Sequence, residues 1–129
     1  MNRRSLLAVL ATLPTLARPA VAQSFVPYEA AAFSRLIASA APIVVHVHAD
    51  WCPTCRAQQP TLQSLARDPA LASVRFVRVD FDRDRDFLRA HRVSSQSTIL
   101  VFRGGRVVTR MIGTTNANEL DRAIRRAVA

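Results

Sequence analysis

The sequence has no lysine, and it contains only two cysteines, three glycines and one tryptophan. All 18 basic residues are therefore arginines, and with nine acidic residues they give a net charge of +9. The arginines show neither the zinc-finger context nor the aromatic-interleaved clusters of nucleic-acid-binding proteins, so we expect no nucleic-acid partner. Internal repeats and low-complexity segments are also absent, and half of the residues are hydrophobic. This composition predicts one packed domain.

The chain has no apolar run of the roughly 20 residues that a membrane-spanning helix needs. Its N-terminal apolar run, Leu6–Leu13, is much shorter and ends at Pro14. Arg3 and Arg4 precede this run, and the small residues of Ala20–Ala22 follow it. A basic start, a short apolar run and a small-residue motif are typical of a secretory signal peptide.

We therefore expect a signal peptide over residues 1–22, cleaved near Ala22, and a mature domain over residues 23–129. Cleavage would remove three arginines and lower the net charge from +9 to +6. An uncleaved membrane anchor is the alternative. The Arg3-Arg4 pair fits a twin-arginine export signal and an ordinary basic start equally well. Either export route leads to an oxidising compartment, and we expect the bacterial periplasm.

Hydrophobic periodicity divides the mature chain into alternating helices and strands. We expect helices over residues 28–39, 53–66 and 83–91, strands over 43–47, 74–81, 98–102 and 106–112, and a last helix capped by Asn116. The early alternation implies parallel strands joined by right-handed crossovers, and Gly104-Gly105 predicts an antiparallel hairpin. The predicted fold class is α/β, with a mixed central sheet of about four strands flanked by helices.

Both cysteines lie between the strand that ends at Val47 and the next helix, in the order Cys52-Pro53-Thr54-Cys55. The first cysteine then lies at a helix N-terminus, where unpaired N–H groups and the helix dipole stabilise a thiolate. The second lies one turn further on, where it can attack a mixed disulfide and release the product. This placement favours a redox pair with Cys52 as nucleophile and Cys55 as resolving thiol.

Two other roles for the cysteine pair stay open. A structural disulfide that closes only four residues would stabilise the fold by roughly 2 kcal/mol, less than a longer loop would give. A metal site that binds copper, zinc or an iron–sulfur cluster is the stronger alternative. Two sulfurs supply half of a tetrahedral site, so His46, His48 or a second copy of the protein would have to complete it.

Nearly the whole of the predicted mature domain resembles a thioredoxin. The resemblance rests on Trp51-Cys52-Pro53-Thr54-Cys55, Pro60, Val79–Asp82, Val101–Gly105 and Gly113. It implies the thioredoxin-like fold and thiol–disulfide exchange through Cys52 and Cys55, with Trp51 shielding the site. The implied partners are thiols and disulfides of other exported proteins, with the reducing direction slightly favoured. Because the sequence has no nicotinamide or flavin motif, we expect no cofactor and a supply of electrons from a membrane thiol carrier.

Two positions near the cysteines depart from the thioredoxin pattern. His46 takes the place of a buried carboxylate, and we expect either a neutral His46 that accepts the Cys55 proton or a hydrogen-bonded core histidine. Ser97 takes the place of a cis-proline, so the Gln96–Ser97 bond is either trans or strained. The Ser97 hydroxyl is then available to donate a hydrogen bond to a cysteine sulfur.

The two residues between the cysteines also differ from those of thioredoxins. Pro53-Thr54 replaces Gly-Pro, and loops of this kind help to spread the potentials of related proteins over about 150 mV. The sequence does not place this protein within that range. The missing cis-proline strengthens the metal alternative, because in thioredoxins this residue lies against the two sulfurs. Gln58 and Gln59 are expected on the helix surface.

Overall fold

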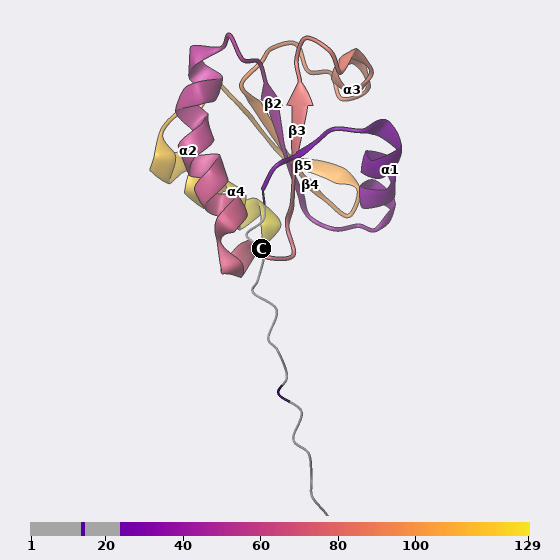
Figure 1. The fold of residues 1–129 in the computed structure, drawn as a ribbon, viewed down its shortest axis with the longest axis vertical. Helices are drawn as coiled ribbons and strands as arrows, with labels where there is room; N and C mark the ends of the chain where they lie inside the picture. Colours follow the sequence, from indigo (N-terminus) through magenta and orange to yellow (C-terminus); the bar gives the residue numbers. More distant parts are fainter. Residues whose placement is uncertain (1–13, 15–23) are drawn as a thin grey trace, which may run out of the picture.

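The computed structural model describes Pro14 and residues 24–129, and it shows a five-stranded sheet with helices on both faces (Figure 1). The strands are β1 (Val26–Pro27), β2 (Ile43–His48), β3 (Arg75–Asp80), β4 (Thr98–Arg103) and β5 (Arg106–Ile112). The helices are α1 (Ala30–Ala38), α2 (Pro53–Arg67), the 3-10 turn η1 (Pro69–Leu71), α3 (Arg85–Ala90) and α4 (Ala117–Val128). In the order β1-β3-β2-β4-β5, the first three strands are parallel and the last two antiparallel to their neighbours. The predicted mixed α/β sheet is confirmed.

The sheet has one strand more than the predicted number of about four. The extra strand, β1, has only two residues and pairs with β3 at Val77 and Arg78. So short a segment has no hydrophobic period of its own, and only its position beside β3 makes it a strand.

The predicted signal peptide lies, apart from Pro14, outside the described residues. Within the described part of the chain, no helix has both the length and the apolar character needed to cross a membrane. Export and cleavage therefore stay predictions.

Helices α1 and α3 cover one face of the sheet, and α2 and α4 cover the other (Figure 1). The α1/α3 face is an apolar cluster that contains Phe33, Phe87 and Phe102. On the α2/α4 face, Leu62 and Leu65 of α2 pack with Leu120 of α4 against the strands. Because helices cover both faces, all six residues of β2 are buried, which explains the nearly continuous apolar character of this strand.

Strands β2 and β3 present different side chains to the two faces, because successive side chains of a strand alternate. The apolar cluster on the α1/α3 face receives Ile43, Val45 and Val47 from β2 and Val77 and Val79 from β3. On the α2/α4 face, the paired positions are Val44 with Phe76, His46 with Arg78, and His48 with Asp80. The α2/α4 face therefore becomes polar toward the C-terminal ends of β2 and β3, and β2 leads from there into the cysteine loop.

Local signals set the ends of the elements around the cysteines. Helix α2 begins with Cys52 as its N-cap and a proline in its first turn, where a missing N–H costs little. Gly104 and Gly105 form the β4–β5 turn with φ of 57° and 78°, conformations that favour glycine. Asn116 Oδ1 caps α4 by accepting a hydrogen bond from the Glu119 backbone N–H at 3.0 Å. All three features agree with the sequence-based expectations.

Candidate active site

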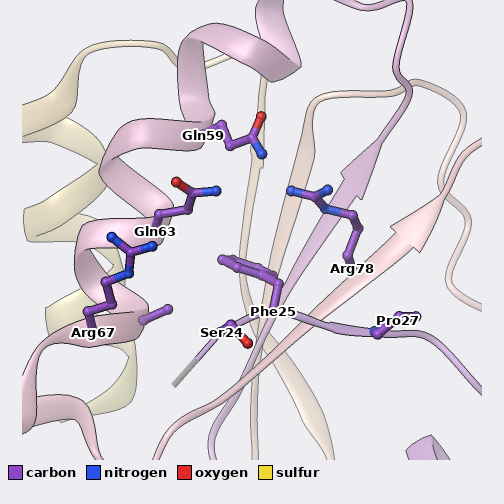
Figure 2. Close-up of a pocket in the computed structure, with 8 residues that line it drawn as sticks. Ser24, Phe25, Pro27, Gln59, Gln63, Arg67 and Arg78 are labelled. Carbon is purple, nitrogen blue, oxygen red and sulfur yellow. The ribbon is translucent and has the colours of Figure 1, made fainter. Parts of the chain in front are cut away.

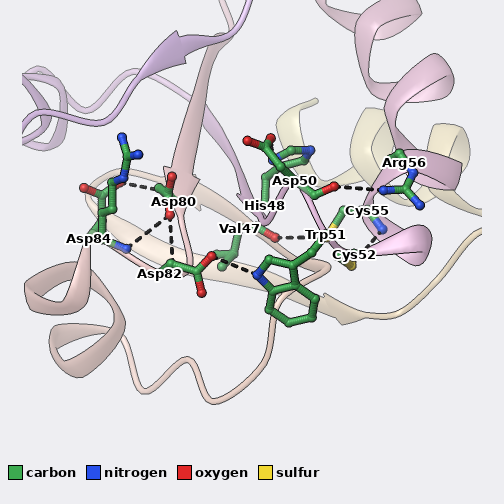
Figure 3. Close-up of polar contacts among 11 residues, drawn as sticks. Val47, His48, Asp50, Trp51, Cys52, Cys55, Arg56, Asp80, Asp82 and Asp84 are labelled. Atoms are coloured by element: carbon green, nitrogen blue, oxygen red, sulfur yellow. Dashed lines mark hydrogen bonds and ion pairs between the residues drawn. The ribbon is translucent and has the colours of Figure 1, made fainter.

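The two cysteines lie where β2 leads into α2 (Figure 3). Cys52 is the N-cap of α2, and its Sγ accepts a hydrogen bond from the Cys55 backbone N–H at 3.1 Å. Cys55 lies one helical turn further on, and its Sγ–H donates to Val47 O at 3.9 Å. Both cysteines are free thiols. A first-turn N–H group thus points at the Cys52 sulfur, an arrangement that stabilises a thiolate.

Both cysteines are buried in a small cluster with Ala49 and Phe81. Cys52 is only 1% exposed, and Cys55 is fully buried. Burial raises the pKa of the Cys55 thiol to about 11, and its hydrogen bond with Cys52 adds to this rise. Cys55 is therefore protonated at neutral pH. A substrate sulfur reaches Cys52 only after the atoms that cover it move.

Trp51 is the exposed side chain next to this cluster, with 56% of its surface accessible. Its Nε1–H donates to Asp82 Oδ2 at 2.8 Å (Figure 3). Its ring also meets the Phe81 ring edge to face, at 6.4 Å between centroids. These contacts fix the indole against the loop that follows β3. An exposed indole beside a buried sulfur offers apolar contact area to a substrate, and the predicted shielding role stays a prediction.

A buried hydrogen-bond network joins β2 and α2 to the segments on either side of the β4–β5 hairpin. His46 Nε2 and Gln58 Oε1 are 2.9 Å apart, and both residues are buried. Gln58 Nε2 donates to Ser97 O at 3.1 Å and to Thr114 O at 2.9 Å. Because two carbonyls accept from the amide nitrogen, the amide oxygen faces His46 and accepts its N–H. The network thus assigns the proton of a neutral His46 to Nε2.

The expectation that Gln58 lies on the helix surface is wrong, because Gln58 is 0% exposed. On α2 it shares a face with the buried residues Cys55, Leu62 and Leu65, at helical spacing. That spacing was the signal available in the sequence, but glutamine is usually exposed. Gln58 is tolerated in the core because both ends of its amide have hydrogen-bond partners. Gln59, the next residue, is only half-buried.

His46 is neutral at pH 7, because burial lowers its pKa from 6.5 to about 4. The hydrogen bond with Gln58 opposes this shift, whereas the charges of His48 and Arg78 add to it. Within the described residues, no hydrogen bond joins His46 to Cys55. The proton-acceptor role predicted for His46 is thus untested. For this role, formation of a mixed disulfide at Cys52 must bring the pKa of Cys55 and the pKa of His46 much closer together.

Ser97 replaces the expected cis-proline with a different backbone conformation. No peptide bond among the described residues is cis, and Ser97 has a φ of 58°, in the left-handed region that disfavours residues with a Cβ. Its hydroxyl donates to Gln96 O at 2.6 Å, so the expected hydrogen bond to a cysteine sulfur is wrong. Ser97 N–H donates to Val47 O at 2.8 Å, and Ser97 O accepts from Gly113 N–H at 3.0 Å. The Ser97 backbone faces the site and lowers the pKa of Cys55.

The described residues do not assemble a metal site around the cysteines. Among them, no group of three or more His, Cys, Asp or Glu side chains is arranged to hold a metal ion. His48, the other candidate ligand, is buried, and its Nδ1 lies 3.6 Å from Asp50 Oδ1. Burial, followed by the charge of Arg78, lowers the pKa of His48. A metal on the two cysteines would therefore need ligands from outside these residues.

Comparison with known sequences assigns the chain to a family. The family model described as Thioredoxin matches residues 24–126. Thioredoxin-2 of Saccharomyces cerevisiae is 32% identical over 87 residues, which are 67% of this chain and 77% of the yeast protein. The chain belongs to the thioredoxin family.

Solved structures and a longer relative agree with this assignment. Trxlp from Edwardsiella tarda EIB202 is 42% identical with a TM-score of 0.73, over 76% of this chain and 95% of that chain. Fasciola hepatica thioredoxin is 30% identical with a TM-score of 0.67, over 76% of this chain and 93% of that chain. Mitochondrial thioredoxin of Mus musculus is 28% identical over 73% of this chain, and the match spans only 56% of the mouse protein.

Proposed function

We propose that the protein is a thiol–disulfide oxidoreductase that exchanges disulfides with other exported proteins. The observation that carries this proposal is the hydrogen bond from the Cys55 backbone N–H to Cys52 Sγ at the start of α2. It favours a thiolate on Cys52 at the end of the helix where the dipole favours negative charge. Membership of the thioredoxin family supports the same reaction.

The reaction has two steps. The Cys52 thiolate attacks one sulfur of a substrate disulfide, forms a mixed disulfide and releases the other substrate sulfur as a thiolate. Cys55 then loses its proton and attacks the Cys52 sulfur, which closes the Cys52–Cys55 disulfide and releases the second substrate sulfur. The substrate disulfide gains the two electrons that the cysteine pair loses.

His46 is proposed to take the Cys55 proton in the second step. In the free protein, the hydrogen bond with the Cys52 thiol raises the pKa of Cys55. The mixed disulfide removes this thiol, so the pKa of Cys55 should fall. Gln58 hydrogen-bonds to both His46 and the Ser97 carbonyl, and the Ser97 backbone faces Cys55. Gln58 and Ser97 are therefore proposed as positioning residues, because neither side chain hydrogen-bonds to a sulfur in the described part of the chain.

Reduction of insulin disulfides by dithiothreitol tests the proposed reaction. The wild-type protein should accelerate this reduction, and Cys52→Ser should lower the rate to the uncatalysed background. Cys55→Ser should accumulate a mixed disulfide through Cys52, which mass spectrometry detects. Thr54→Ser is a matched control inside the same loop and should stay active. Catalysis by Cys52→Ser at the wild-type rate would contradict the proposal.

Export to the periplasm with removal of residues 1–22 is a further part of the proposal. Its support is the order of basic, apolar and small residues at the N-terminus, and the family match, which begins at residue 24. The mass of protein recovered from a periplasmic extract should correspond to a chain that begins at Gln23. The double substitution Arg3→Lys and Arg4→Lys should block export if the twin-arginine route is used. Full-length protein retained in the cytoplasm would contradict export.

The reducing direction is proposed for the cell, with electrons from a membrane thiol carrier. The support is the compact thioredoxin form and the lack of a nicotinamide or flavin motif in the sequence. Trapping thiols with an alkylating reagent in intact cells measures the redox state of the pair. A pair that is mainly reduced at steady state agrees with a reductase, and a mainly oxidised pair contradicts this direction.

A further inference from the structure

A pocket of about 250 Å³ lies between α2 and the strand edge formed by β1 and β3 (Figure 2). The α2 wall carries Gln59, Gln63 and Arg67, which lie four residues apart and therefore share one helix face. The opposite wall carries Phe25 and Arg78. No cysteine lines the pocket, so it is distinct from the redox site.

This pocket has positive charge without an acidic partner. Arg67 and Arg78 lie on its opposite walls (Figure 2), and none of the described residues that line it has a carboxylate side chain. In the described part of the chain, neither arginine takes part in a salt bridge. The Arg78 Nε is buried and has no hydrogen-bond partner there. A buried N–H without an acceptor is unfavourable, so the described residues leave the Arg78 guanidinium short of hydrogen-bond acceptors.

The lining fits a carboxylate attached to a small apolar body. A guanidinium binds a carboxylate through two parallel hydrogen bonds in one plane. The Phe25 ring lies between the two arginines (Figure 2), and Pro27 and Ala66 add apolar surface. A volume of about 250 Å³ is slightly below that of pockets for drug-sized ligands, which begin at about 300 Å³.

We propose that this pocket binds a small organic carboxylate, with the carboxylate on Arg78 and the hydrocarbon part on Phe25. The site lies next to the buried network, because Arg78 pairs in register with His46 and Gln59 follows Gln58. Binding requires no cysteine chemistry, so the pocket can bind a carboxylate whether or not the cysteines exchange disulfides.

Titration of the ¹⁵N-labelled protein with benzoate, followed by nuclear magnetic resonance, tests the site. Benzoate should give saturable shifts at the Gln59 and Gln63 side-chain amides and at Arg78. Benzamide, which has the same ring without the charge, should bind at least about tenfold more weakly. Cys52→Ser should bind benzoate as the wild type does, which separates this site from the redox pair.

Two pocket variants and a control locate the binding on Arg78. Arg78→Gln should weaken benzoate binding by about tenfold or more, because it removes the charge and the fork of donors. Arg75→Gln, on the same strand and outside the pocket, should leave binding unchanged. If Arg78→Gln fails to fold, Gln63→Glu provides the test, because its negative charge should abolish benzoate binding. Shifts that do not saturate, or equal weakening by Arg75→Gln, would overturn the proposal.

Discussion

Along β2 and β3, the face of the sheet under α1 and α3 is apolar, whereas the face under α2 and α4 becomes polar toward the cysteines. On the apolar face, the Phe33 ring packs edge to face against Phe87 and Phe102, with centroids 5.4 and 5.5 Å away. On the polar face, His46 and Gln58 form a hydrogen bond, and both residues are buried like the phenylalanines.

The difference separates two tasks of one sheet. Apolar packing is non-directional, so the α1/α3 face contributes stability and tolerates changes that keep its volume. Buried hydrogen bonds are directional and unfavourable when one partner is lost, so the α2/α4 face specifies the geometry around Cys55. Substitutions on the apolar face should therefore change stability alone, and those on the polar face should change stability and redox properties together.

The largest loss of stability is expected from Phe87→Ala on the apolar face. Removing this buried ring should lower the free energy of unfolding by about 3–5 kcal/mol, measured by urea denaturation. The reduction potential of the cysteine pair should stay at the wild-type value, because Phe87 belongs to a cluster without cysteines. If the variant does not fold, Phe87→Leu gives a smaller version of the same test. A shifted potential in either variant would break the distinction between the faces.

The pH dependence of stability should report His46. Its pKa is about 4 in the folded protein and 6.5 ordinarily, so between these values the unfolded chain binds a proton that the folded protein does not. Stability should therefore fall as the pH decreases from about 6.5 to about 4, by roughly 3 kcal/mol from this group. His46→Leu should remove this part of the pH dependence.

His91 provides the control on the apolar face. Its ring packs against Phe87 and Phe102, and burial, followed by the charge of Arg110, lowers its pKa. His91→Leu should remove only the contribution of His91 to the pH dependence of stability and leave the contribution of His46 unchanged. An unchanged pH profile in His46→Leu would contradict the assignment of the larger contribution to the polar face.

Gln58→Leu should lower the free energy of unfolding by about 2–3 kcal/mol, because it leaves the buried His46 Nε2 without its partner and removes the amide donor to the Ser97 and Thr114 carbonyls. It should also shift the reduction potential, since it removes one of the hydrogen bonds that hold the Ser97 backbone facing Cys55. The neighbouring Gln59→Leu is the matched control, with an expected change within about 0.5 kcal/mol. Equal effects of the two variants would argue against the network.

The smallest effect is expected from Ser97→Gly. Glycine adopts the φ of 58° without the Cβ penalty, so this variant should be more stable by about 0.5–1 kcal/mol. Ser94→Gly, in the same loop, is the control for the loss of backbone entropy and should be neutral or destabilising. A loss of stability in Ser97→Gly would show that its hydroxyl contributes more than the backbone strain costs.

The sequence alone predicted the features that depend on local patterns. The strand before the cysteines, the helix that begins at Cys52, the glycine turn and the Asn116 cap all follow from residues close together in the chain. The burial of Gln58 and the backbone conformation of Ser97 depend on partners 12 to 56 residues away, which a single sequence does not identify. For the same reason, the short strand β1 was missed.

The proposed function depends on Cys52 and Cys55 forming a redox pair. Equilibrating the protein in buffers of reduced and oxidised thiols, with trapping of free thiols, measures its reduction potential. We expect a reversible two-electron transition between about −270 and −120 mV in the wild-type protein and none in Cys52→Ser. A pair that stays reduced across this range, or that forms no intramolecular disulfide, would show that Cys52 and Cys55 are not a redox pair.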